Sequence, residues 1–397
     1  MESKAESSWP AIGSKSMPWI SPPDSNVSRR QSLKHRGPFQ AAVVPHISIQ
    51  ELNLQASQLA LADEAAVELG RFDSEIGQML APFASILLRS EAASSSQIEN
   101  LTSSPAAIVR AELGLKETAN SALIVSNQNA MSAAVAASSE LTSGSILEMH
   151  RVLMHQSDPG HAGKLRKEPV WIGGSISGPH EADFVAPDFA SVPELIEDLV
   201  TFCNRTDLPA LVQVAIAHAQ FETIHPFTDG NGRTGRALVQ VLLHRLGVTK
   251  SVMVPVSAGL LRNTDKYFMA LTEYRLGNPL AIINVFSEAS LLAVQNGRAL
   301  AAELEAVKMH WQFLTQTRSD SGAKQLLDSL LGQPVITSAR AVEILRRTPA
   351  NAQLAIDKLV ELKILTQQGS AKRNRVWQAD DVLIALDKFA ARTRRIT

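Results

Sequence analysis

The chain has 397 residues, which is enough for two or three domains that each bury a core of their own. Its 38 basic and 39 acidic residues give a formal charge of -1, so the overall charge does not indicate a protein that binds nucleic acid or a membrane surface. The single cysteine, Cys203, excludes an intramolecular disulfide, and its apolar neighbours predict a buried core side chain.

The first residues lack the charged start and the apolar run of a secretory signal. No apolar stretch reaches the roughly 18 residues that a membrane span needs. The richest stretch, Leu238 to Val248, is interrupted by His244 and Arg245. We therefore expect a cytoplasmic protein that does not enter a membrane.

The predicted elements are mainly helical. Residues 1–45 are rich in Ser and Pro and predict an irregular N-terminal arm. Residues 46–125 predict an N-terminal helical region, because apolar residues such as Leu59, Ala62 and Leu69 recur at three- and four-residue steps. Further helices are expected over Ala106–Leu113, Asn127–Ser139, Ser145–Met154, Val192–Asn204, Leu211–Ile224, Gly232–Leu246, Lys266–Leu276 and Pro279–Glu305.

One segment departs from this helical pattern. Between residues 166 and 187, the apolar run Val170 to Ile172 precedes a Gly-Gly and a Gly-Pro, and Phe184 and Val185 follow. Two short apolar runs with glycine and proline between them are typical of a β-hairpin. We therefore expect a short hairpin within a helical core that spans residues 126–315.

The last part of the chain, residues 316–397, begins with a polar run and predicts a small separate domain. Two helices are expected over Ala339–Arg346 and Ala350–Leu362, followed by an extended run, a basic turn and a second extended run. This order is typical of a winged-helix domain. The fold class we predict is mainly α, with a short hairpin and a C-terminal winged-helix domain.

The segment that carries chemistry is His225-Pro-Phe-Thr-Asp-Gly-Asn-Gly-Arg-Thr-Gly-Arg236, which lies between two apolar helices. We expect Pro226 to end the first helix and to place His225 in an extended conformation. Gly230 and Gly232 allow the backbone to turn several N–H groups inward, at the start of the second helix. Such a cluster at a helix N-terminus binds anions, and phosphate is the expected guest.

Charged residues around this turn extend the prediction to a polyphosphate. Arg233 and Arg236, three residues apart on the first helical turn, can donate to outer phosphates. Asp229 beside a phosphate indicates a bridging Mg²⁺, which prefers one or two carboxylates plus phosphate oxygens. His225 titrates near neutral pH and can take a proton from an incoming hydroxyl, so it is the candidate general base.

This segment resembles the signature of the Fic family, HPFx(D/E)GNGRxxR, at every fixed position. The resemblance implies a Fic-type helical bundle that transfers AMP from ATP to a Ser, Thr or Tyr hydroxyl of a target protein. A lysine in the cradle accompanies a kinase-like reaction in this family, and the glycine here favours adenylyl transfer instead. The residues implied are His225 as base, Asp229 as Mg²⁺ ligand, and Phe227, Gly230, Asn231, Gly232, Arg233, Gly235 and Arg236 as nucleotide and phosphate contacts.

A second motif lies upstream, at Ser94 to Asn100. Ser96 and Glu99 fit a capping box at a helix N-terminus. The segment also resembles the inhibitory motif of the same family, (S/T)xxxE(G/N), through Ser95, Glu99 and Asn100. In that interpretation Glu99 pairs with Arg236 and holds the enzyme at low activity. A role of Glu99 in hydrolytic removal of AMP stays open.

Two further features have both a functional and a purely structural interpretation. The hairpin resembles the flap with which family members hold an extended stretch of the target, here Trp171, Ile172, Gly173 and Gly174; the alternative is a surface hairpin anchored by its tryptophan. Tyr267 lies where relatives carry an aromatic near adenine, and a core aromatic is the alternative. His218 and Glu222 lie one turn apart but lack the HExxH order, and His218 shares a face with apolar residues, so we expect a core histidine.

The partners expected are ATP and an unidentified target protein, and self-modification and a homodimer are also considered. The C-terminal domain carries basic residues in its predicted wing, Lys372, Arg373 and Arg375, so contacts with DNA or with a partner protein are both open. Two alternative functions remain: AMP removal or another nucleotidyl transfer at the same site, and a winged-helix DNA-binding regulator.

Overall fold

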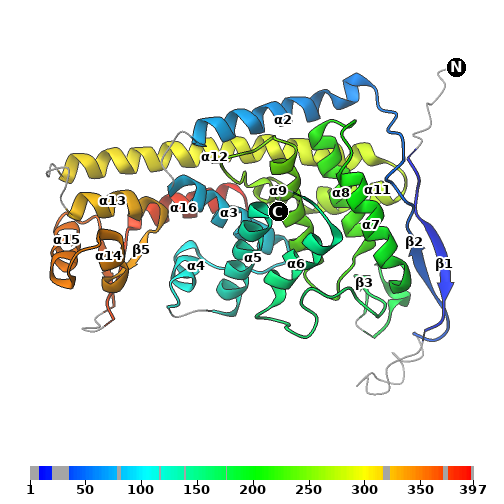
Figure 1. The fold of residues 1–397 in the computed structure, drawn as a ribbon, viewed down its shortest axis with the longest axis horizontal. Coiled ribbons are helices and arrows are strands. Elements are labelled where there is room, and N and C mark those ends of the chain that lie inside the picture. The colour runs from blue at the N-terminus through cyan, green and yellow to red at the C-terminus, as the bar shows by residue number, and fades with distance from the viewer. Residues whose placement is uncertain are drawn as a thin grey trace. The chain divides into compact units, whose positions relative to one another are not determined.

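The fold is known from a computed structural model, which describes residues 9–19, 35–77, 82–115, 118–137, 140–175, 177–315, 322–369 and 374–394. Helices make up most of these residues, and the strands described form small antiparallel sheets (Figure 1). The predicted mainly α class is confirmed. The chain divides into two compact units: unit 1 combines residues 1–66, 130–246 and 265–287, and unit 2 combines residues 67–129, 247–264 and 288–397.

Most helices agree closely with the predicted ranges. However, α5 begins eight residues before the predicted Asn127, α12 continues well past Glu305, and three helices, α10, α13 and α16, were not predicted. Their bounds are α2 Ala56–Gly77, α3 Pro82–Ile98, α4 Pro105–Glu112, α5 Ala119–Ala136, α6 Ser143–Met154, α7 Val192–Cys203, α8 Ala210–Ile224, α9 Asn231–Arg245, α10 Val256–Leu261, α11 Thr264–Arg275, α12 Pro279–Thr315, α13 Gly322–Gly332, α14 Ser338–Leu345, α15 Pro349–Glu361 and α16 Asp380–Arg392.

The centre of unit 1 is α8. Every residue from Leu211 to Ile224 is buried, because α8 is apolar on nearly every face and packs between α7 and α9. Helix α6 packs on α9 from another side. Cys203 at the end of α7 is buried, as predicted, and burial raises the pKa of its thiol to about 12. The loop between α8 and α9 is therefore held by rigid, buried supports.

The N-terminal arm is not irregular throughout, which corrects the prediction for residues 1–45. Strands β1 (Gly13–Met17) and β2 (Phe39–Val43) form an antiparallel pair with Gly13 opposite Val43. The partners lie far apart in the sequence, so no local periodicity announces them. Trp19 stabilises the pair, because its ring packs edge-on against Phe39.

The hairpin predicted in the helical core is present. Strand β3 (Trp171–Ile172) pairs antiparallel with β4 (Phe184–Val185), with Trp171 opposite Val185. Phe39 and Ala41 of β2 pack with Val185 in one small apolar cluster, and Trp19 and Trp171 add their rings to it at 5.7 Å between centroids. Two-residue strands are too short to be stable alone, so the arm supports the hairpin.

Unit 2 is organised around α3. Arg89 of α3 donates to both oxygens of Glu112 at 2.8 Å and to the carbonyl of Gly332. Glu91 accepts hydrogen bonds from the backbone N–H and the hydroxyl of Ser257, at the start of α10. Both side chains are buried, and buried charges are stable only when they are paired in this way. They fix α3 firmly within its unit.

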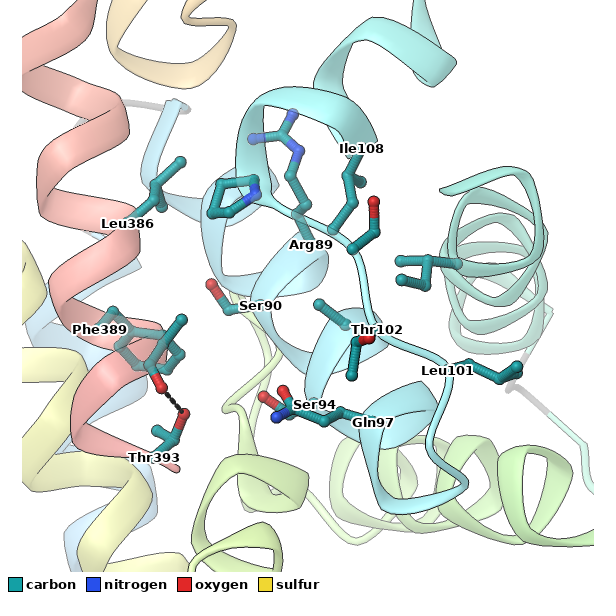
Figure 2. Close-up of a pocket in the computed structure, with 15 residues that line it drawn as sticks. Arg89, Ser90, Ser94, Gln97, Leu101, Thr102, Ile108, Leu386, Phe389 and Thr393 are labelled. Atoms are coloured by element: carbon teal, nitrogen blue, oxygen red, sulfur yellow. Dashed lines mark hydrogen bonds between the residues drawn. The ribbon is translucent and has the colours of Figure 1, made fainter. Parts of the chain in front are cut away.

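A cavity of about 60 Å³ lies beside α3 (Figure 2). Figure 2 shows Ser90, Ser94 and Gln97 of α3 on one side and Leu386 and Phe389 of α16 on the other. Its volume is that of a few atoms, so we treat it as a packing feature of unit 2.

The C-terminal part of unit 2 shows the element order helix, strand, helix, helix, strand, strand, helix. Strands β5 (Val335–Thr337), β7 (Val376–Gln378) and β6 (Thr366–Gln368) form an antiparallel sheet in that order. Membership of the winged-helix class stays a prediction, as does DNA binding. Lys372 and Arg373 lie outside the described residues, whereas Arg375 lies over the Trp377 ring and donates to Gln353.

The four-part division predicted along the chain, with boundaries near residues 45, 125 and 315, stays a prediction, because each compact unit combines separate segments. No helix in the described part of the chain is both long enough and apolar enough to cross a membrane.

Candidate active site

The loop between α8 and α9 begins with His225 in a left-handed conformation, at φ 51° and ψ 61°. This corrects the extended conformation expected before Pro226. His225 still closes the last turn of α8, because its N–H donates to the carbonyl of Phe221 at 2.9 Å. A left-handed residue ends a helix sharply, and the proline that follows prevents α8 from continuing. Non-glycine residues in this region are uncommon and often mark functional sites.

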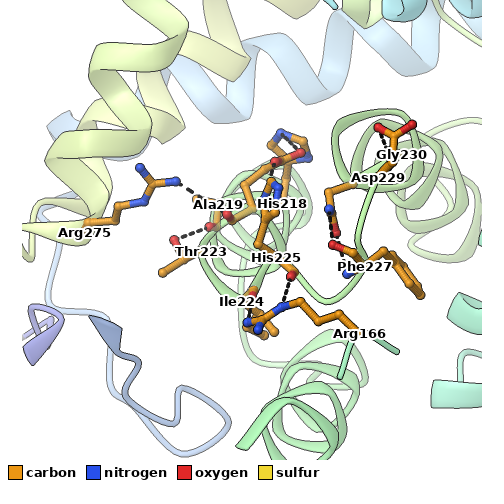
Figure 3. A network of polar contacts seen from close by, with 12 residues as sticks. Arg166, His218, Ala219, Thr223, Ile224, His225, Phe227, Asp229, Gly230 and Arg275 are labelled. Carbon is orange, nitrogen blue, oxygen red and sulfur yellow. Dashed lines mark hydrogen bonds and ion pairs between the residues drawn. The ribbon is translucent and has the colours of Figure 1, made fainter. Parts of the chain in front are cut away.

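One side chain, that of Asn231, forms hydrogen bonds with the backbone in the middle of the loop. Asn231 accepts from the N–H of Phe227 at 2.9 Å and donates to its carbonyl at 2.8 Å (Figure 3). Asp229 accepts from the N–H of Gly230, which is left-handed at φ 74°. A Cβ on Gly230 would lie 2.9 Å from the sulfur of Met154, so glycine is required here. Gly232 lies in the first turn of α9 and has no positive φ, so of these two glycines only Gly230 is left-handed, and phosphate binding by Gly232 stays a prediction.

His150 of α6 supports this loop and was not predicted from the sequence. Its Nδ1 accepts from the N–H of Gly163, so Nε2 carries the proton and donates to the carbonyl of Asp229, both at 3.0 Å. Its ring stacks on Phe227, with centroids 3.7 Å apart. Burial lowers the pKa of His150 to about 4. In the sequence, His150 has only the pattern of a residue on an apolar helix face, because Ile146 precedes it by one turn.

The start of α9 has the features of an anion site. Gly230 is its N-cap and offers no side chain, so no capping side chain takes up the first backbone N–H groups. Arg233 and Arg236 are both buried on the same helix, and Nη2 of Arg233 lies 3.6 Å from Asp229. The helix dipole adds to this positive potential. The structure therefore brings together the residues predicted to bind phosphate.

His225 lies beside this helix start, with its side chain 18% exposed. Nδ1 lies 4.0 Å from the carboxylate of Glu222, one turn earlier on α8. Burial is the main cause that lowers the pKa of His225 to about 4, and Arg275 and Arg166 add to it. The imidazole is therefore neutral near pH 7, which is the form that accepts a proton.

The polar residues behind the loop form a buried cluster. Tyr267 is fully buried and its hydroxyl lies 2.7 Å from Nε2 of His218. This placement favours a core aromatic and a core histidine, and the contact of Tyr267 with adenine stays a prediction. A Cβ on Gly235 would lie 2.8 Å from Glu222, so Gly235 allows close packing of α8 and α9. Its contact with nucleotide also stays a prediction.

The segment with the predicted inhibitory motif forms the C-terminal end of α3. Asn100 is left-handed at φ 63°, and the N–H groups of Glu99 and Leu101 donate to the carbonyl of Ser96. The capping-box alternative is therefore wrong, because Ser96 lies at the end of a helix and not at its beginning. Ser95 is buried, whereas Asn100 is exposed. Glu99 belongs to unit 2 and Arg236 to unit 1, so their ion pair stays a prediction.

The predicted flap residues form β3 and the two glycines that follow it. Gly173 and Gly174 are exposed and have positive φ, and a Cβ on either would lie within 2.5 Å of Asp183 or Glu181. Ile172 is also exposed, whereas Trp171 is half-buried against the N-terminal arm. The tryptophan is therefore anchored, as the alternative interpretation expects, and binding of a target by the exposed hairpin stays a prediction.

A metal site is limited to what one carboxylate can offer. Within the described ranges, no group of three His, Cys, Asp or Glu side chains is placed to hold an ion. Asp229 is 68% exposed beside the uncapped start of α9. Mg²⁺ is usually held by one or two carboxylates, phosphates and water, so Asp229 beside the predicted phosphate site leaves the Mg²⁺ site a prediction.

Three buried histidines predict that acid destabilises unit 1. Burial lowers the pKa values of His150, His218 and His225 to about 4, 3 and 4, from an ordinary value of 6.5. The unfolded chain therefore binds protons that the folded chain does not, and the free energy of unfolding falls as the pH drops from about 6.5 to about 4. Thermal unfolding midpoints across this range measure the slope.

The matched pair for that experiment is His218→Gln and His161→Gln. His218 is fully buried whereas His161 is largely exposed, so loss of His218 should make the slope shallower than loss of His161 does. Equal slopes in both variants would contradict the assignment.

A known protein family matches the part of the chain that contains this loop. The model of the Fic/DOC family matches residues 140–243. Protein adenylyltransferase fic-1 of Caenorhabditis briggsae is 32% identical over 159 residues, which cover 39% of this chain and 28% of that protein. Protein adenylyltransferase Fic of Drosophila willistoni is 37% identical over 109 residues, which cover 27% and 20%. The chain thus spans less than a third of the length of these relatives.

The fold has a counterpart among solved structures. A Fic family protein from Desulfovibrio desulfuricans G20 superposes with a TM-score of 0.54 at 21% identity, over 82% of this chain and 97% of that chain. At this identity the likeness concerns the fold alone. The family match shows that residues 140–243 of this chain carry a domain of the Fic/DOC family.

Proposed function

We propose that the chain is a protein adenylyltransferase, which transfers AMP from ATP to a Ser, Thr or Tyr hydroxyl of a target protein. One observation carries the proposal: His225, neutral near pH 7, lies beside the uncapped start of α9, where Arg233 and Arg236 are buried. The relatives named protein adenylyltransferase support the choice of reaction.

The reaction requires little covalent chemistry from the protein. Nδ1 or Nε2 of His225 takes the proton of the target hydroxyl, and the oxygen attacks the α-phosphorus of ATP. The bond between that phosphorus and the oxygen bridging to the β-phosphate breaks, and pyrophosphate leaves. The product is a phosphodiester between the target side chain and AMP. His225 returns its proton to solvent.

The residues of the loop supply binding and charge. The first N–H groups of α9 and the two buried guanidinium groups bind the phosphate oxygens, where negative charge gathers during transfer. Asp229 would hold Mg²⁺, which neutralises phosphate charge when it is bound. Gly232, in place of a lysine, leaves the cradle open to the phosphates and is part of the case for AMP transfer.

A restraint by Glu99 belongs to the same proposal. The carboxylate sits at the C-terminal end of α3, which Arg89 and Glu91 hold in place within unit 2. A carboxylate that pairs with Arg236 would occupy the guanidinium and the space of a terminal phosphate. The low basal activity that follows would rise when α3 is displaced.

The position of the label in ATP tests the reaction. Incubated with Mg²⁺ and ATP labelled at the α-phosphate, the Glu99→Gly protein should acquire label on itself or on an added protein acceptor. ATP labelled at the γ-phosphate should leave no label, because the β- and γ-phosphates depart together. Autoradiography reads both. Label from the γ-phosphate would instead identify a phosphotransferase, and competition by GTP, UTP and CTP reports nucleotide preference.

The reverse direction is the second outcome of the same assay. Glu99 at a helix end could position water for removal of AMP from a modified protein. Label that appears and is then lost from the wild-type chain, but persists on the Glu99→Gly chain, would favour removal as the physiological activity.

A further inference from the structure

Arg166 is a buried arginine whose hydrogen bonds go to backbone carbonyl groups. It lies on the segment that leads from α6 into the β3–β4 hairpin, and it is 3% exposed. Its Nε donates to the carbonyl of His225 at 2.8 Å (Figure 3). The other guanidinium nitrogens donate to the carbonyls of Pro187 at 2.6 Å, Glu168 at 3.1 Å and Ile224 at 3.4 Å.

From this geometry we propose that Arg166 is a positioning residue, which fixes the backbone of the catalytic base and ties it to the hairpin predicted to hold the target. The inference rests on the proposed function. It adds a residue that lies outside the loop signature and that touches neither nucleotide nor target.

The first part of the argument concerns the end of α8. The last carbonyls of a helix have no partner within the helix and carry the negative end of its dipole. Ile224 and His225 supply two of these carbonyls, and Arg166 takes up both. The left-handed backbone of His225 is an uncommon conformation that persists only where the surroundings determine it. The guanidinium is the group that holds the carbonyl of this residue.

The second part concerns the hairpin. Glu168 lies just before β3 and Pro187 just after β4, so Arg166 holds both strands at their base. The backbone N–H of Arg166 also donates to the carbonyl of Pro226, inside the active-site loop. A displacement of the hairpin is therefore transmitted to the base through one planar group. Only arginine donates in a fixed fork in several directions, and lysine at this position would keep the charge and lose the geometry.

The charge of Arg166 persists under assay conditions. Burial lowers the pKa of the guanidinium to about 10, and Asp188 partly opposes that shift. The group is protonated at neutral pH. Its hydrogen bonds to four carbonyls compensate the burial of the charge.

The test uses Arg166→Lys and Arg166→Gln, each in the Glu99→Gly chain. The matched control is Arg205→Lys, because Arg205 of unit 1 also donates to backbone carbonyls, those of Ser48 and Gln50, away from the site. A misplaced base should lower kcat for labelling from α-phosphate-labelled ATP on the order of 100-fold. The KM for ATP should stay within about twofold, because the phosphate contacts remain.

A second readout does not depend on activity. Hydrogen exchange followed by mass spectrometry should show faster exchange over residues 225–231 and 171–185 in both Arg166 variants, and unchanged exchange there in the control. If the parent chain transfers no label, the proposed function fails, and hydrogen exchange alone decides the role of Arg166.

Three results would overturn the inference. One is wild-type kcat in a folded Arg166→Lys chain. Another is unchanged exchange over both segments. The third is unfolding of both Arg166 variants at the assay temperature while Arg205→Lys stays folded, which would assign Arg166 to stability alone.

Discussion

Replacing His225 by alanine is expected to abolish AMP transfer while ATP binding persists. The imidazole of His225 is neutral near pH 7 and can therefore accept a proton. It needs to do so only at the step in which the target hydroxyl attacks. The phosphate contacts come from the start of α9, Arg233 and Arg236, which the substitution leaves in place. A general base contributes about 100- to 10,000-fold to a rate, so labelling should fall by that factor.

The measurement is the initial rate of labelling from α-phosphate-labelled ATP, with equilibrium binding of a non-hydrolysable ATP analogue beside it. His161→Ala is the matched control, because His161 is an exposed histidine of the same unit that contacts Asp158. Labelling by His225→Ala at the control rate would sink the assignment of the base. Loss of analogue binding would show that His225 holds the nucleotide instead.

The pH dependence of the wild-type rate checks the same assignment. Because the pKa of His225 is about 4, the neutral imidazole predominates at every pH above about 5. If protonation of His225 controls the rate, the rate should stay constant as the pH falls from about 8 to about 5. Below about pH 5 the rate should decline. An ordinary histidine, with a pKa near 6.5, would already halve the rate at about pH 6.5 and lower it about 30-fold at about pH 5.

The sequence motif was sufficient to predict which residues make up the site, but not the backbone conformation of its loop. His225, Asp229, Asn231 and the two arginines lie together because the twelve-residue segment is short and both flanking helices are buried. The carbonyl of left-handed His225 accepts a hydrogen bond from Arg166, which is 59 positions upstream and has no spacing pattern with the loop. A carbonyl contact from a distant side chain leaves no periodic signal in a sequence.

Contacts between residues that are distant in the sequence also explain other differences between the predicted and the observed structure. Strands β1 and β2 are each five residues long and pair across more than 20 residues, so their partners cannot be read from local alternation. His150 serves the loop through its two ring nitrogens, yet it occupies an ordinary buried position of an amphipathic helix. By contrast, α13 carries leucines at 326, 327, 330 and 331, a helical spacing that the polar run before it obscured.

Replacing Glu99 by glycine is expected to increase labelling. In the proposed restraint, the carboxylate pairs with Arg236 and occupies the place of a terminal phosphate, so its removal frees the guanidinium for ATP. Coupling between two sites is typically worth a factor of about 5 to 150, and we expect the initial rate to rise within that range. Labelling by wild type and variant at equal protein concentration measures it.

Backbone changes must be separated from loss of the carboxylate, because glycine also loosens a helix end. Asn100→Gly is the matched control: Asn100 is adjacent, exposed and left-handed at φ 63°, a conformation that glycine adopts without strain. It should label at the wild-type rate. Glu99→Gln keeps the size of the side chain and removes its charge, so it should be activated nearly as much as Glu99→Gly. If Asn100→Gly is activated as strongly, the helix end and not the carboxylate sets the rate; if none of the three is activated, Glu99 does not restrain the enzyme.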